Sequence, residues 1–119
     1  MSTTVYKEVS FEAAHRLPHV PKGHKCERLH GHSYRVLIEV SGELNEIGWV
    51  VDYADIVAVW RPIHELLDHH YINEVPGLEN STSEILARWI FWRLRPSLPG
   101  LSCITVRETC TAGSVYRGD

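Results

Sequence analysis

Three histidines in the first third of the chain could hold a metal ion. His30 and His32 lie two residues apart, and His15 lies upstream of them. Three neutral imidazoles with an open fourth position are typical of a catalytic zinc site. A lone histidine on an apolar strand face is more often a core residue, but a His-Gly-His pair with a third histidine favours a metal site. Gly31 strengthens this hypothesis, because a residue without a side chain lets another group approach the metal closely.

Cys26 precedes His30 by four residues and allows two interpretations. As a fourth zinc ligand, it would close the site and make the metal structural. As a free thiolate, it would act as a base beside an open site. The spacing alone leaves both alternatives open.

Asp68 and His69 form a second candidate group, which follows a predicted helix. The carboxylate could orient the adjacent imidazole, and the pair could tune a nearby thiol. The structural alternative is that the histidine interacts favourably with the dipole at the end of the helix.

Glu108 is predicted to share a strand face with Ile104 and Val106. A carboxylate on a buried face stays ionised only when it has a partner. Either an arginine, such as Arg16 or Arg107 of the partner subunit, or a ligand with two parallel N–H donors would satisfy it.

The alternation of polar and apolar residues predicts the strands that carry the histidines. The first strand runs from Thr4 to Leu17, and a loop over Pro18–Lys25 separates it from a second strand over His30–Ser41. His15 and the His-Gly-His pair fall on the apolar faces of these strands. A hairpin would therefore bring the three imidazoles together.

Two helices are predicted in the middle of the chain. Asp52 is the expected N-cap of the first helix, and apolar residues at helical spacing extend it to Leu67. Pro62 lies inside this helix and predicts a kink or a reset. Ser81–Glu84 has the S-x-x-E form of a capping box at the start of the second helix, which Pro96 ends.

Two further strands, roughly Leu101–Thr109 and Ser114–Arg117, close the chain. The resulting order, β-β-α-α-β-β, predicts an α+β fold in which a four-stranded antiparallel sheet carries both helices on one face. The 119 residues suit a single domain over residues 1–119. Because one face and both edges of the sheet stay bare, we expect a homo-oligomer in which the sheets join into a larger barrel.

The composition excludes several other classes of protein. A net charge of −3 with scattered basic residues lacks the electrostatic footprint of a nucleic-acid-binding protein. The N-terminus has no signal-peptide pattern, and no apolar run is long enough to span a membrane. The three cysteines include no CxxC pair, which suits a reducing compartment, and Cys103 and Cys110 are expected to be small buried residues. We therefore expect a cytoplasmic protein.

Several separate motifs, in order along the chain, together resemble the pyruvoyl-tetrahydropterin synthase superfamily. They are Phe11–Leu17, Cys26–Tyr34, Leu67–His70, Asn80–Glu84 and Val106–Thr109. Within that superfamily, the short Cys-x-x-x-His-Gly-His spacing is similar to that of the bacterial 6-carboxytetrahydropterin synthases. One departure is Ser81, which stands where relatives often have proline.

The resemblance implies the tunnelling fold (T-fold), in which subunits join their sheets into a barrel and active sites form at subunit interfaces. It assigns His15, His30 and His32 as the Zn²⁺ ligands. It also places Cys26, Asp68 and His69 in the catalytic group and makes Glu108 the pterin anchor.

The activity that the resemblance implies is that of a zinc-dependent lyase. Such an enzyme converts 7,8-dihydroneopterin triphosphate to 6-carboxy-5,6,7,8-tetrahydropterin, with release of acetaldehyde and triphosphate, in the biosynthesis of queuosine and other 7-deazapurines. One alternative is 6-pyruvoyltetrahydropterin synthase activity on the same substrate. The other is a zinc-stabilised binding protein without catalytic activity.

Overall fold

The computed structural model describes residues 2–119. Its elements follow the predicted order of two strands, two helices and two strands. They are β1 (Thr3–His15), β2 (His30–Gly42), α1 (Tyr53–Leu67), α2 (Ser83–Leu94), β3 (Leu101–Arg107) and β4 (Gly113–Tyr116), with short 3₁₀ turns over Lys25–Glu27 and Ile72–Glu74.

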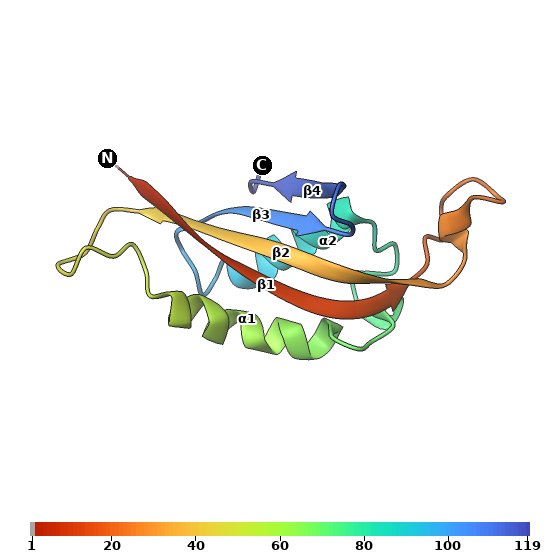
Figure 1. Ribbon diagram of the computed structural model, residues 1–119, viewed down its shortest axis with the longest axis horizontal. Helices are drawn as coiled ribbons and strands as arrows, with labels where there is room; N and C mark the ends of the chain where they lie inside the picture. Colours follow the sequence, from red (N-terminus) through yellow and green to blue (C-terminus); the bar gives the residue numbers. More distant parts are fainter. Residues whose placement is uncertain (1) are drawn as a thin grey trace.

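The four strands form one antiparallel sheet in the order β1-β2-β3-β4. The two long strands pair over their full length, from Thr3 opposite Gly42 to His15 opposite His30. β1 therefore ends two residues before the predicted Leu17. The segment between the two strands projects beyond the end of the sheet, as the orange part of Figure 1 shows.

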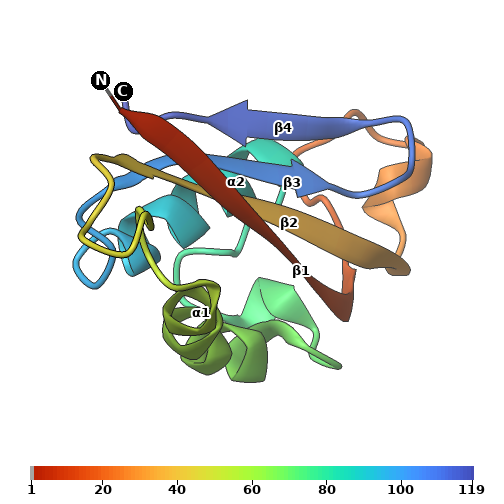
Figure 2. The ribbon, with the colours of Figure 1, turned by 60° about the vertical axis from the view of Figure 1, so that its left-hand side comes forward.

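Both helices cover the same face of the sheet, as predicted (Figures 1 and 2). Each presents an apolar stripe to the apolar sides of the strands, because residues three and four apart fall on one side of a helix. The helices contribute these buried residues: Ile56, Trp60, Ile63, Leu67, Leu86, Ala87, Ile90, Phe91 and Leu94. This single core fixes the sheet and both helices in one layered unit.

The two helices confirm one prediction and correct two others. The Asp52 side chain caps α1 by accepting a hydrogen bond from the backbone N–H of Ala54 at 2.8 Å. The sequence predicts a kink or a reset at Pro62, and the structure shows no reset, because α1 continues through this residue to Leu67. The N-cap of α2 is Thr82, not the first serine of the S-x-x-E motif. The hydroxyl of Thr82 accepts from the N–H of Ile85 at 3.1 Å, which leaves the preceding side chain free for another contact.

The other face of the sheet is polar and carries contacts between β1 and β2. Arg35 forms an ion pair with Glu8 at 3.4 Å, and the Ser33 hydroxyl donates to the Glu12 carboxylate at 2.7 Å. β1 and β4 are the two edge strands. None of the helices within residues 2–119 is long and apolar enough to cross a membrane.

Candidate metal centre

The β1–β2 pair brings three histidines together on the helix-covered face of the sheet. His15 is opposite His30, and His32 is opposite Ala13. One possible ligand nitrogen from each imidazole lies within 4.8 Å of those of the other two. The ring centroids are 4.6 Å apart for His15 and His30, 5.1 Å for His15 and His32, and 4.9 Å for His30 and His32. The predicted convergence of the three imidazoles is therefore present.

Hydrogen bonds with backbone carbonyls set the tautomers of two of these rings. His15 Nδ1 lies 2.9 Å from the carbonyl oxygen of Ser81, and His30 Nδ1 lies 2.7 Å from that of Arg28. A carbonyl can only accept, so each Nδ1 carries the hydrogen and each Nε2 keeps a lone pair. The Nε2 atom of His15 is buried and has no hydrogen-bond partner among the described residues. A buried lone pair inside a cluster of imidazoles fits a metal ligand.

Burial keeps the rings of His15 and His32 neutral near pH 7. Burial is the main cause that lowers the pKa of His15 from 6.5 to about 4. The hydrogen bond with Ser81 raises this pKa in part, and the charges of His30 and His32 lower it slightly further. Burial, and then the charge of His30, also lower the pKa of His32. Because metals bind the neutral form of imidazole, protons compete weakly with a metal for these two rings at neutral pH.

Cys26 lies in the short 3₁₀ turn before β2 and is partly buried. Its N–H donates to His24 Nδ1 at 3.0 Å, and its carbonyl accepts from the N–H of Leu17 at 2.8 Å. Among residues 2–119, the cluster that could hold a metal consists of the three histidines alone. This geometry favours the free thiol over a fourth ligand, and the thiol's catalytic role stays a prediction.

Asp68 is the C-cap of α1, and its carboxylate contacts three groups. One oxygen accepts from the backbone N–H of Glu12 at 2.9 Å. The other lies 2.8 Å from His69 Nδ1 and 3.5 Å from His64 Nε2. The bond from Glu12, followed by that from His69, lowers the pKa of Asp68, so the carboxylate is ionised at neutral pH. None of these contacts reaches Cys26.

The Asp68–His69 pair is held against the outer edge of β1. The N–H of His69 donates to the carbonyl of Glu12 at 2.6 Å, and the N–H of Ala14 donates to His70 at 3.1 Å. His69 has a φ of 57°, in the left-handed region that non-glycine residues rarely adopt. Such a conformation persists only where its surroundings hold it, as the contacts with β1 do here.

Glu108 lies one residue beyond the end of β3, rather than inside the strand as predicted, and is half-buried. Burial raises its pKa, the nearby Glu84 carboxylate raises it further, and the charge of His30 opposes both. No ion pair among residues 2–119 includes it. The Nε of Arg16, a partner considered from the sequence, instead donates to the carbonyl of Glu27 at 3.1 Å. Glu108 is therefore a carboxylate near the histidines that has no cationic partner among the described residues.

Two residues beside the histidines were not predicted to contribute. The buried Tyr34 ring lies 5.3 Å from that of His32, and its hydroxyl has no hydrogen-bond partner among residues 2–119. In the sequence it looks like an ordinary core residue, because it continues the apolar face of β2. Ser81 contacts His15 across 66 residues of sequence, and no local pattern indicates such a contact.

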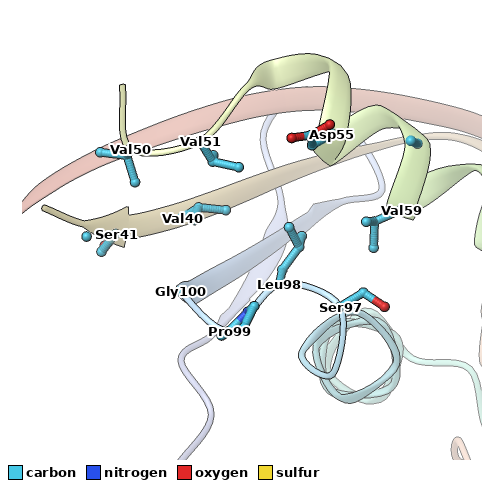
Figure 3. A pocket seen from close by; sticks show the side chains of 12 residues that line it. Val40, Ser41, Val50, Val51, Asp55, Val59, Ser97, Leu98, Pro99 and Gly100 are labelled. Carbon is cyan, nitrogen blue, oxygen red and sulfur yellow. The ribbon is translucent and has the colours of Figure 1, made fainter. Parts of the chain in front are cut away.

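An apolar groove of about 540 Å³ lies at the far end of β2, away from the histidines. The end of β2, the start of α1 and the connection before β3 line it, and Figure 3 shows valine and leucine side chains around it. Asp55 is the only charged residue in its lining. Because this lining contains no histidine or cysteine, the groove lacks the residues for the predicted chemistry.

Comparison with known proteins shows similarity over nearly the whole chain. The profile of the 6-pyruvoyl tetrahydropterin synthase family matches residues 4–119. A Synechocystis sp. protein named 6-carboxy-5,6,7,8-tetrahydropterin synthase is 45% identical, covering 94% of this chain and 91% of that protein. The dihydroneopterin monophosphate aldolase of Pyrococcus furiosus is 34% identical, covering 84% of this chain and 82% of that protein. The structure of Caenorhabditis elegans 6-pyruvoyl tetrahydropterin synthase has a TM-score of 0.91 and 26% identity, covering 100% of this chain and 97% of that chain.

Proposed function

Because the chain belongs to the 6-pyruvoyl tetrahydropterin synthase family, we propose that it is a zinc-dependent 6-carboxytetrahydropterin synthase. This lyase would convert 7,8-dihydroneopterin triphosphate to 6-carboxy-5,6,7,8-tetrahydropterin, acetaldehyde and triphosphate, as a step toward queuosine. The observation that carries the proposal is the cluster of three imidazoles in a chain 45% identical to a relative of that name. We further propose that residues 1–119 act as one cytoplasmic domain.

His15, His30 and His32 would hold the zinc ion, which their converging imidazoles fit. Bound there, zinc would supply Lewis-acid chemistry by lowering the pKa of hydroxyl groups on the side chain of the substrate. Three protein ligands leave the open position that a catalytic site requires.

The remaining residues would bind substrate and move protons. Cys26 would act as the base on the substrate side chain, and the Asp68–His69 pair would supply or relay protons. Glu108 would accept two parallel N–H bonds from the pterin ring and so position the side chain at the histidines. The absence of a cationic partner for Glu108 among the described ion pairs supports this role.

The architecture supports an active site shared between subunits. Adjacent strands are antiparallel throughout, and β1 and β4 are the edges. If β4 of one copy paired antiparallel with β1 of the next copy, the sheets could close into a barrel. All subunits of this barrel would have the same orientation along its axis. The Asp68–His69 pair on the outer edge of β1 would then face the neighbour's turn between β3 and β4, beside the neighbour's Glu108.

Analysis of the products by mass tests the proposed reaction. Incubation with 7,8-dihydroneopterin triphosphate should give 6-carboxy-5,6,7,8-tetrahydropterin and acetaldehyde. The second candidate is the 6-pyruvoyl activity, which the names of the family and of the C. elegans structure support. That reaction leaves the side-chain carbon bond intact, so a tetrahydropterin product without acetaldehyde would replace the first proposal by the second.

A further inference from the structure

His15 and Ser81 form an unusual buried contact. Among residues 2–119, they are the only buried residues outside the hydrophobic types, and both have a relative exposure of 0%. Buried polar groups require hydrogen-bond partners, because an unsatisfied group keeps its full desolvation cost. Each of these two residues provides the other with that partner.

Ser81 approaches one nitrogen of His15 with two oxygens. Its carbonyl oxygen lies 2.9 Å from His15 Nδ1, and its hydroxyl oxygen lies 3.2 Å from the same atom. The carbonyl fixes the hydrogen on Nδ1, and the hydroxyl can accept a share of the same hydrogen. Together they orient the ring so that Nε2 lies within the histidine cluster.

The position of the α2 N-cap explains why Ser81 is available for this contact. The hydroxyl of Thr82 caps the helix through the N–H of Ile85 at 3.1 Å. The Ser81 side chain therefore makes no capping bond, although the S-x-x-E pattern predicts one, and it turns to His15 instead. The first turn of α2 is thus linked to a ring on β1.

The other histidines have no comparable support from a distant part of the chain. Nδ1 of His30 bonds to the carbonyl of Arg28, only two residues away. His32 makes no described hydrogen bond through its ring. The orientation of His15 is therefore the one that depends on how α2 packs against the sheet.

We propose that Ser81 is a positioning residue that raises the affinity of the His15, His30 and His32 site for zinc. This inference rests on the proposed metal site but concerns a residue that would touch neither metal nor substrate. Hydrogen-bonding partners of metal-bound histidines fix the tautomer and ring orientation, and their removal typically weakens metal binding by 10- to 100-fold. Ser81→Ala keeps the carbonyl, so we expect the lower end of that range, about 10-fold.

Competition with a chromophoric chelator tests this effect on the purified full chain. Zinc affinity should fall about 10-fold in Ser81→Ala and stay at the wild-type value in Ser83→Ala. Ser83 is a matched control, because its hydroxyl lies in the same turn but bonds to that of Ser114 at 2.6 Å. Equal zinc affinity in wild type and Ser81→Ala would overturn the inference and leave the metal site intact. Failure of the wild type to bind zinc would overturn both.

A second measurement does not depend on the folding of a variant. In the metal-free wild type, ¹⁵N chemical shifts of the His15 ring should show a protonated Nδ1 and an unprotonated Nε2. The opposite tautomer would overturn the role of Ser81 whatever the zinc measurements show.

Discussion

At the scale of single residues, the histidine cluster destabilises the folded chain but favours the binding of a metal ion. A buried neutral imidazole whose Nε2 has no described partner is unfavourable for the folded chain. Metal ligation would satisfy that atom, and no proton has to leave the ring first, since burial lowers the pKa of His15 to about 4. The same feature predicts how the metal-free protein responds to acid.

The metal-free protein should lose stability as the pH falls from about 6.5 to about 4. In this window the unfolded chain binds a proton at His15, whose pKa returns to 6.5, while the folded chain does not. The folded state is therefore most stable above this pH window. Its free energy of unfolding falls by at most about 3 kcal/mol as the pH drops through the window. Urea denaturation at several pH values in the presence of a chelator measures this slope, and His15→Gln should flatten it. An equal slope in both proteins would show that His15 is not the titrating group.

Glu108→Gln should impair pterin binding while leaving the fold unchanged. The substitution keeps the shape of the side chain but replaces one acceptor oxygen with a donor, so one ring N–H of the pterin would face a donor. The expected loss is roughly 2–4 kcal/mol of substrate stabilisation, seen as a lower kcat/KM and weaker pterin binding. Zinc content and Tm should stay near wild type. A lower Tm with normal pterin binding would instead identify Glu108 as a structural residue.

At the scale of elements, the start of α2 supports both the helix and the histidine beside it. Thr82→Ala removes the hydroxyl that caps Ile85 and should lower the free energy of unfolding by about 1 kcal/mol. Thr111→Ala, in the exposed turn before β4, is the control and should change stability by no more than about 0.5 kcal/mol. Urea denaturation compares the two variants. Equal stabilities would mean that another group caps α2.

The strands could be predicted from the sequence, because a period of two specifies which side chains share a face. The pairing of His15 with His30 follows from that pattern. Contacts between distant elements could not be predicted. The S-x-x-E pattern pointed to Ser81 as the N-cap, yet its side chain bonds to His15. Cys110 was predicted to be buried but is exposed, because the β3–β4 turn lies outside the core.

At the scale of the whole molecule, the single chain leaves apolar surface on both edge strands. Tyr6 of β1 is 64% exposed and Val115 of β4 is 51% exposed. Exposed apolar side chains and unpaired backbone groups along the edges of a sheet favour association with further copies. The Asp68–His69 pair also makes no described contact with Cys26, which the proposed shared active site would explain.

Mixed oligomers test whether active sites are shared between subunits. Cys26→Ala and His69→Ala should each lose activity by about 100-fold or more, the usual scale for a positioned proton-transfer group. If the two residues act across an interface, equal amounts of both variants, dissociated and reassembled together, should recover about a quarter of the wild-type activity. A mixture as inactive as its components would place both residues in a site within one chain.

We propose that three histidines of this chain hold the zinc ion at which a pterin lyase acts. The most direct test of this claim measures acetaldehyde release from 7,8-dihydroneopterin triphosphate by chelator-treated protein, before and after zinc is restored. The treated protein should stay folded but inactive, and about one zinc per chain should restore the release of acetaldehyde. His32→Ala should bind no zinc and stay inactive. Equal acetaldehyde release with and without metal, or none from the zinc-loaded protein, would contradict the claim.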